Sequence, residues 1–238
     1  TPLALSLGVP AGTLLGTIAG WRLCFAVITL LAAGLMVWIQ LRVPDFAGQA
    51  RTERTSAGKV LRIAGIRPVL FVILAFVLSH NILYTYVSPV LAHVGLTGDT
   101  SRVLFTFGIT SLLSIWIVGW MIDNHLRRLT LAAPLLFGVA VVILALSDQH
   151  TLLVYVAVAA WGLALGGAAT LFQTALLKAA GNAADVAQSM AVTVWNIAIA
   201  GGGLTGGILI SQFSGTAFPA VILLLLLAAL TEIYLATT

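Results

Sequence analysis

The chain has 238 residues, of which 61% are hydrophobic and only 8% are charged, and its mean hydropathy is +1.12. Soluble domains carry about 25% charged residues, so this composition excludes an ordinary soluble domain and predicts an all-α, polytopic membrane bundle. The net charge of +4 does not indicate nucleic-acid binding, because the basic residues gather between hydrophobic segments. A single cysteine, Cys24, excludes an internal disulfide and a cysteine-rich metal site.

The first predicted span covers residues 2–19 and carries a stripe of small residues. Glycines recur at every fourth position and therefore share one helix face: Gly8, Gly12, Gly16 and Gly20. Such residues let two helices approach closely in a bilayer, and Pro10 should bend the same helix. The stripe predicts either a general helix contact or a face with a mechanical role in a transporter.

Seven further hydrophobic stretches are long enough to cross a membrane. They cover residues 23–41, 68–92, 103–122, 129–146, 152–177, 186–212 and 216–235. Nine of the eleven Lys and Arg residues follow the second, fourth and sixth spans: Arg42, Arg51, Arg54, Lys59, Arg62, Arg67, Arg127, Arg128 and Lys178. Because positively charged loops stay in the cytoplasm, we expect both ends of this chain on the cytoplasmic side.

The seventh span repeats the small-residue spacing of the first span, with Gly203, Gly207, Ser211 and Gly215. Such a match six spans apart is typical of carriers built from two six-helix halves. On this interpretation residues 1–41 are the last two helices of an N-terminal bundle. Residues 42–67 form the cytoplasmic loop between the bundles, and residues 68–238 form a C-terminal six-helix bundle. Four helices are then expected to be missing in front of Thr1.

Four segments carry a family resemblance. They are Gly8-Val9-Pro10-Ala11-Gly12, Gly20-Trp21-Arg22 with Phe25, the run from Gly119 to Arg128, and Tyr84-Thr85-Tyr86 with Pro89. Together they resemble the major facilitator superfamily, in particular its twelve-helix drug:proton antiporter branch, which includes bacterial sugar-efflux and chloramphenicol-efflux permeases. The resemblance covers the whole chain, as the fifth through twelfth helices of that fold. The first segment departs from the branch's Gly-Pro signature by one inserted residue.

The run from Gly119 to Arg128 resembles the second copy of the superfamily's cytoplasmic-loop motif. Gly119, Asp123, Arg127 and Arg128 match that motif, whereas Asn124 and Leu126 replace a basic residue and a glycine. The resemblance implies that Asp123 helps to hold the inward gate closed. The alternative is that this carboxylate caps the N-terminus of the next helix or accepts a hydrogen bond from Arg127.

Polar side chains inside the spans are the candidate substrate-cavity residues, because such groups face a cavity or another helix. His80 shares a helix face with Tyr84 and Ser88, and an unperturbed imidazole titrates near neutral pH. It is therefore a candidate for proton coupling, for substrate contact or for packing. The full candidate set is His80, Asn81, Tyr84, Tyr86, Gln173, Trp195 and Asn196. For Gln173 and Asn196, interhelical contact is the alternative role.

The sequence lacks a Gly-x-x-x-x-Gly-Lys-Ser/Thr segment, a metal-ligand set and a catalytic constellation. We therefore expect no ATP hydrolysis by this chain, no cofactor, no metal and no enzymatic activity. The resemblance implies an efflux carrier of the bacterial cytoplasmic membrane that exports small drugs or sugars by alternating access.

The same resemblance implies that the proton gradient drives transport, and we expect a monomer whose partners are its substrate and the lipid bilayer. The coupling acid is then expected on the missing helices, so that this chain alone would not transport. Two alternatives remain: an eight-span permease subunit driven by a separate ATPase, or a non-transporting membrane scaffold. A membrane-bound enzyme ranks below both, because the spans lack paired histidines or carboxylates.

Overall fold

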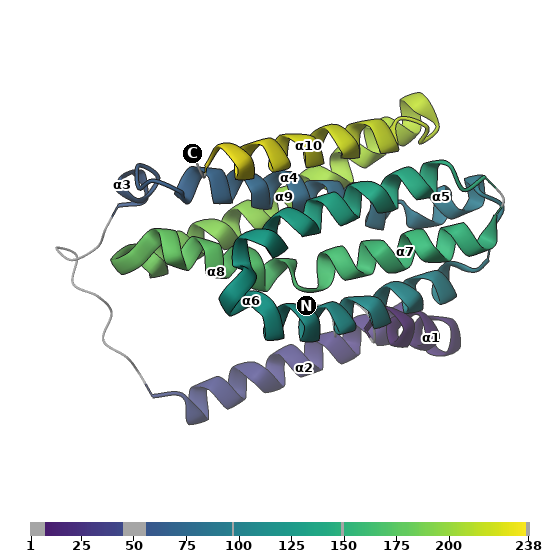
Figure 1. Ribbon diagram of the computed structural model, residues 1–238. Helices are drawn as coiled ribbons and strands as arrows, with labels where there is room; N and C mark the ends of the chain where they lie inside the picture. The colour runs from purple at the N-terminus through teal and green to yellow at the C-terminus, as the bar shows by residue number, and fades with distance from the viewer. Residues whose placement is uncertain (1–7, 45–55, 97, 149, 237–238) are drawn as a thin grey trace. The chain divides into compact units, whose positions relative to one another are not determined.

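The structure, a computed structural model, describes residues 8–44, 56–96, 98–148 and 150–236. Within these ranges every regular element is a helix, as the sequence predicts. The chain forms two compact units. One holds α1 and α2, and the other holds α3 to α10 (Figure 1).

The first unit is a helical hairpin of α1 (Val9–Ala19) and α2 (Trp21–Arg42). Gly20 joins them with a φ of +81°, a backbone angle that glycine adopts without strain, and its N–H closes α1 on the Gly16 carbonyl. The Cys24 thiol lies 3.6 Å from the Gly12 carbonyl oxygen. A Cβ added at Gly16 would meet Cys24, whereas one added at Gly8 or Gly12 would meet no described atom within 4 Å.

Pro10 lies in the first turn of α1, where its missing N–H breaks no helical hydrogen bond. The bend expected at Pro10 involves residues 2–7, which lie outside the described residues.

The second unit is a bundle of longer helices. In chain order these are α3 (Ala57–Val60), α4 (Ile66–Thr85), α5 (Val87–His93), α6 (Thr100–Ala145), α7 (Thr151–Gly166), α8 (Ala168–Ala180), the 3-10 helix η2 (Gly181–Ala183), α9 (Ala184–Phe213) and α10 (Phe218–Leu235). The short α3 and the first two residues of α4 lie inside the segment 42–67, which was predicted to be a loop. They are ordered because Val60 and Ile66 are fully buried.

Among the described residues, five helical stretches are long and apolar enough to cross a membrane: Trp21–Arg42, Ile66–Thr85, Thr100–Ala145, Thr151–Phe213 and Phe218–Leu235. Two of these are too long for one crossing. The 46 residues of α6 would extend about 69 Å at 1.5 Å per residue, whereas the hydrocarbon core is about 30 Å thick. His125 departs from helical angles inside α6, between the predicted spans 103–122 and 129–146. The five stretches thus cover the predicted spans from the second onward, whereas α1, with 11 described residues, is shorter than a full crossing.

Two predicted spans are interrupted in the structure. The span 68–92 is split at Tyr86, where α4 ends and α5 begins. The cause lies three residues later, because Pro89 has no N–H to donate to the Thr85 carbonyl one turn earlier. The span 152–177 is split at Gly167, whose N–H donates to Ser114 Oγ of α6 at 3.1 Å.

The bundle is held together by close contacts between α6 and α7 and between α4 and α9, with α10 packed against α4 and α6 (Figure 1). Ser111 Oγ donates to the Gly162 carbonyl at 3.1 Å, and Ser114 Oγ donates to the Leu163 carbonyl at 2.6 Å. A Cβ added at Gly166 would overlap the Ser111 carbonyl. Small residues and hydroxyls thus join α6 to α7, as is common between helices in a bilayer.

The contact of α4 with α9 is built on small residues of the seventh span. The close approach is made by Gly202 against Asn81 and by Gly206 against Tyr86. A Cβ added at Gly203 would instead meet no described atom within 4 Å. Ser211 is exposed and Gly215 lies in the turn before α10 with a φ of +82°. Gly207, which belongs to the predicted pattern, also lies at this interface, because a Cβ added there would meet the Tyr86 hydroxyl at 2.8 Å. The interface therefore combines Gly202 and Gly206 with Gly207 of the face that matches the first span.

Candidate functional site

An aromatic cluster fills the middle of the bundle. We use this name for His80 and Tyr84 of α4, Phe107 of α6 and Trp161 of α7. The His80 and Phe107 rings stack with centroids 5.9 Å apart, and the centroids of Phe107 and Trp161 are 4.5 Å apart. The Tyr84 ring lies 5.2 Å from that of His80. Ring contacts of this kind stabilise a core beyond simple burial.

One polar contact orders the aromatic cluster. Trp161 Nε1 donates to His80 Nδ1 at 3.2 Å. Because Nδ1 accepts, the imidazole proton in this arrangement lies on Nε2. The His80 side chain is 6% exposed and Trp161 is 1% exposed. Sequence reasoning did not identify Trp161 as a candidate, since its bond to a histidine 81 residues away has no local sequence signal.

The other two candidates of the third span lie elsewhere, at the contact of α4 with α9. Asn81 Nδ2 donates to the Val77 carbonyl of its own helix at 2.8 Å. The Tyr86 hydroxyl donates to the Gly203 carbonyl of α9 at 3.0 Å. Both side chains are half-buried. The candidates of this span therefore separate into a core pair, His80 and Tyr84, and an interface pair.

The remaining candidates lie on α8 and α9. Gln173 of α8 and Asn196 of α9 are exposed, and Trp195 is half-buried. Asn196 follows Ser189 and Thr193 at intervals of seven and three residues, so all three share one face of α9, and all three are exposed. We call these three residues the α9 polar stripe. Sequence reasoning missed Ser189 and Thr193, although their helical spacing before Asn196 was available as a signal.

Each member of the α9 polar stripe donates a hydrogen bond to its own helix backbone. Ser189 Oγ donates to the Val186 carbonyl, Thr193 Oγ1 to the Ser189 carbonyl and Asn196 Nδ2 to the Val192 carbonyl. These bonds reduce the cost of placing polar groups in an apolar span. The side-chain oxygens keep the capacity to accept further hydrogen bonds.

The residues that match the loop motif flank the kink of α6. Asp123, Arg127 and Arg128 are exposed around His125, and an added Cβ at Gly119 would meet no described atom within 4 Å. Since His125 is the residue that leaves helical angles, Asp123 does not occupy the N-cap position before the second half of α6. The helix-capping alternative for Asp123 is therefore wrong.

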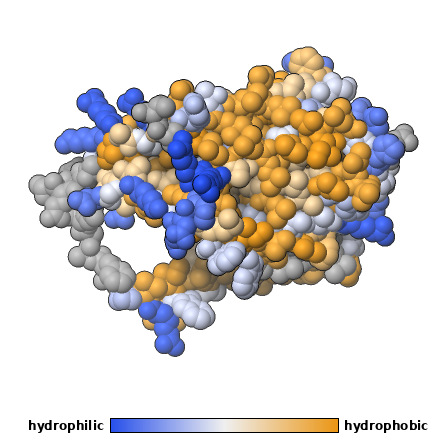
Figure 2. All heavy atoms as spheres, in the orientation of Figure 1, coloured by the Kyte–Doolittle hydropathy of each residue, from blue (hydrophilic) through white to orange (hydrophobic). Residues whose placement is uncertain are grey.

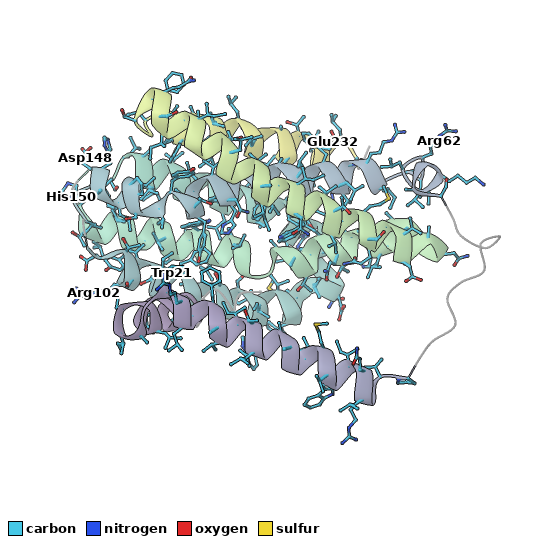
Figure 3. All side chains as sticks on the ribbon, turned by 180° about the vertical axis from the view of Figure 1, so that it is seen from behind. Trp21, Arg62, Arg102, Asp148, His150 and Glu232 are labelled. Atoms are coloured by element: carbon cyan, nitrogen blue, oxygen red, sulfur yellow. The ribbon has the colours of Figure 1, made fainter. Side chains whose placement is uncertain are left out.

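Charged groups of the second unit gather at its two ends. Arg62 and Glu232 lie toward one end, and Arg102, Asp148 and His150 lie toward the other (Figure 3). Figure 2 shows an apolar surface over α6, α7 and α10 between the polar ends. This distribution is that of a multi-pass membrane protein, whose apolar band meets lipid.

A family model described as Major Facilitator Superfamily matches residues 1–203. The chain belongs to this superfamily. It is therefore an all-α, multi-pass membrane protein of a transporter family and not an enzyme. Membership confirms the superfamily predicted from the four sequence segments.

Curated relatives of this superfamily member carry efflux descriptions. The chain is 28% identical over 215 residues to a probable sugar efflux transporter of Mannheimia succiniciproducens, a match that covers 86% of this chain and 52% of the relative. It is 26% identical over 210 residues to a similarly described protein of Pasteurella multocida, covering 86% of this chain and 51% of the relative. It is 25% identical over 208 residues to the purine ribonucleoside efflux pump NepI of Escherichia coli, covering 86% of this chain and 52% of that pump. The chain thus spans about half the length of these relatives.

Proposed function

We propose that the protein acts as a small-molecule efflux carrier that exports neutral, hydroxyl-rich molecules of the sugar and nucleoside class by alternating access. The observation that carries this proposal is the alignment of 86% of the chain with proteins described as sugar and purine ribonucleoside efflux transporters. These identities, together with superfamily membership, favour a carrier over a permease subunit or a scaffold. In such a carrier two helix bundles rock around a central site and expose it to one side at a time.

The α9 polar stripe is our proposed substrate contact. Its hydroxyls and amide carry no charge, which suits sugars and nucleosides that present hydroxyl and amide groups. Polar groups on an exposed face of a span are costly against lipid, so a water-filled cavity is the environment that suits Ser189, Thr193 and Asn196. Trp195 next to the stripe and Gln173 on α8 belong to the same proposal, through stacking and hydrogen bonding.

His80 and Tyr84 receive a different role in this proposal. Both rings belong to the aromatic cluster, and the His80 Nδ1 atom is occupied by Trp161. We assign them to the rigid core that supports α4, α6 and α7, rather than to proton transfer. Asn81 and Tyr86 hold α4 against α9, where glycines leave room for them.

Gating and energy coupling complete the proposal. Asp123, Arg127 and Arg128 would form the cytoplasmic gate beside the kink of α6, and proton antiport would supply the energy. The excess of basic residues after the second, fourth and sixth predicted spans supports a cytoplasmic location for both ends of the chain. The division into bundles at residues 1–41 and 68–238 belongs to the same proposal.

Export from cells tests the function and the stripe together. Cells lacking their own efflux pumps are loaded with a radiolabelled purine ribonucleoside or a labelled neutral sugar, and the label that leaves is measured. Expression of the full-length protein should speed export. Asn196→Ala should slow export about threefold to tenfold, the equivalent of one lost hydrogen bond.

The matched control is Ile197→Ala, the neighbouring α9 residue, whose side chain is 57% exposed but apolar. It should export at the original rate at equal membrane abundance. If cells that express the protein export neither label faster than cells without it, the proposed function would be overturned. Equal export by the two variants would overturn only the assignment of the stripe.

A further inference from the structure

A cavity lies away from the aromatic cluster, at the end of the bundle where α8 and α10 finish. Its volume is about 400 Å³, within the range of small-ligand sites. We call it the basic cavity, and its lining residues come from four helices that are distant in sequence. Those used below are Val69 and Val72 of α4, Arg127 of α6, Phe172, Ala175 and Lys178 of α8, and Ile233 of α10.

The basic cavity combines an apolar wall with two cationic side chains. Val69, Val72, Phe172 and Ile233 supply hydrocarbon surface. Arg127 begins the half of α6 that follows the kink, and Lys178 lies in the last turn of α8. Both of these side chains are exposed, and no Asp or Glu occurs among the described residues that line the cavity.

The position of the basic cavity along the helices matches the interface between the bilayer core and water. Its cations lie where apolar spans end, and Arg62 and Glu232 mark the same end of the unit (Figure 3). Its walls continue into the apolar spans through Val72 and Phe172, and the Phe172 ring packs on Phe76 of the core with centroids 5.3 Å apart. A ligand there would place an anionic group at the polar boundary and a hydrocarbon chain toward the membrane interior.

We propose that the basic cavity binds an anionic glycerophospholipid of the surrounding membrane. Its phosphate would interact with Arg127 and Lys178, and one acyl chain would lie against Val69, Val72 and Ile233. Basic pockets between membrane helices are known to hold anionic lipid headgroups. A free phosphate would gain nothing from the apolar wall, and a zwitterionic lipid would gain less from the cations, because its own ammonium group offsets the charge of its phosphate. The proposal requires neither transport nor a particular orientation of the protein.

Native mass spectrometry of the detergent-purified, full-length protein tests the proposal. The protein is mixed with phosphatidylglycerol or phosphatidylcholine of identical acyl chains, and the lipid-bound fraction is measured. Phosphatidylglycerol should bind more tightly. Lys178→Gln should weaken its binding about fivefold, because one basic residue near an anionic lipid contributes about 1 kcal/mol. Lys178→Arg should retain the binding, and Arg62→Gln, which alters a charge at the same end but outside the cavity lining, should leave it unchanged.

Two further arms distinguish a lipid site in the cavity from lipid adhering to the outer surface and from a simple phosphate site. Ala175→Phe should fill the cavity and reduce phosphatidylglycerol binding, whereas Ala220→Phe on the exposed face of α10 should not. Excess inorganic phosphate should leave lipid binding intact. Any one of four results would overturn the proposal. The two lipids could be retained equally, or Lys178→Gln and Arg62→Gln could have equal effects. The two phenylalanine variants could have equal effects, or phosphate could displace the lipid.

Discussion

At the scale of single residues, the hydrogen bond between Trp161 and His80 is the most specific contact in the bundle. It joins α7 to α4 across a cluster of rings in which both partners are almost fully buried. Hydrogen bonds between membrane helices contribute about 0.6 kcal/mol on average and up to about 1.7 kcal/mol. Because this bond also fixes the orientation of the His80 ring, we expect a value toward the upper end.

Replacing Trp161 by Phe tests that contact. The variant keeps an aromatic ring but loses the indole N–H, so it should lower the free energy of unfolding in detergent by about 1–2 kcal/mol, including the smaller ring. Trp116→Phe is the control, because Trp116 lies on α6 with its side chain 80% exposed. A thermal melt that shifts equally for both variants would contradict the assigned role of the bond.

Several residue contacts could not be predicted from the sequence. Polarity alone identified His80, Tyr84 and Asn196 as unusual in apolar spans. It could not separate a core histidine from a cavity histidine, because the difference depends on Trp161 and Phe107, which are brought close only by the fold. The α9 polar stripe could have been predicted from the sequence, since the spacing of Ser189, Thr193 and Asn196 is a local helical pattern.

At the scale of elements, two helix pairs depend on glycine for their close approach: α6 with α7, and α4 with α9. Ser111 and Ser114 of α6 reach carbonyls of α7 only because Gly162 and Gly166 let the two backbones approach. A methyl group at Gly166 would overlap the Ser111 carbonyl, which belongs to the backbone and cannot rotate away. The cost of a glycine within a helix is therefore offset here by interhelical packing.

Two glycine substitutions should have opposite effects. Gly166→Ala should destabilise the protein by about 1–3 kcal/mol through overpacking against α6. Gly203→Ala should be neutral or slightly stabilising, because a Cβ added at Gly203 would meet no described atom within 4 Å and alanine favours a helix. Chemical unfolding in detergent measures both variants. A loss of stability for Gly203→Ala that matches that of Gly166→Ala would show that the two positions do not differ as described.

The spans themselves were predictable because hydrophobic stretches of about 20 residues have few alternatives to a membrane helix. The positions at which these spans are interrupted were harder to predict from the sequence. Pro89 interrupts its span at Tyr86, about one turn before the proline itself. The break at Gly167 depends on Ser114, which lies on another helix. The glycine spacing of the seventh span included Gly207, which lies against Tyr86, but it did not identify Gly202 and Gly206, which also approach α4 closely.

At the scale of the whole molecule, the chain is a member of the Major Facilitator Superfamily that spans about half the length of its curated relatives. Composition, the alternation of basic segments and four short motifs were sufficient to predict that family. The substrate was not predictable, because a central site in such carriers lies between two bundles. The efflux descriptions of the relatives are what direct the proposal toward sugars and nucleosides.

Transport into proteoliposomes tests the proposed proton-driven efflux most directly. The full-length protein is reconstituted in vesicles with an acidic interior, and labelled purine ribonucleoside or sugar is added outside. We predict that the label accumulates above its external concentration as protons leave, and that a protonophore abolishes the accumulation. Absence of accumulation, or accumulation that persists after the proton gradient is dissipated, would contradict the account.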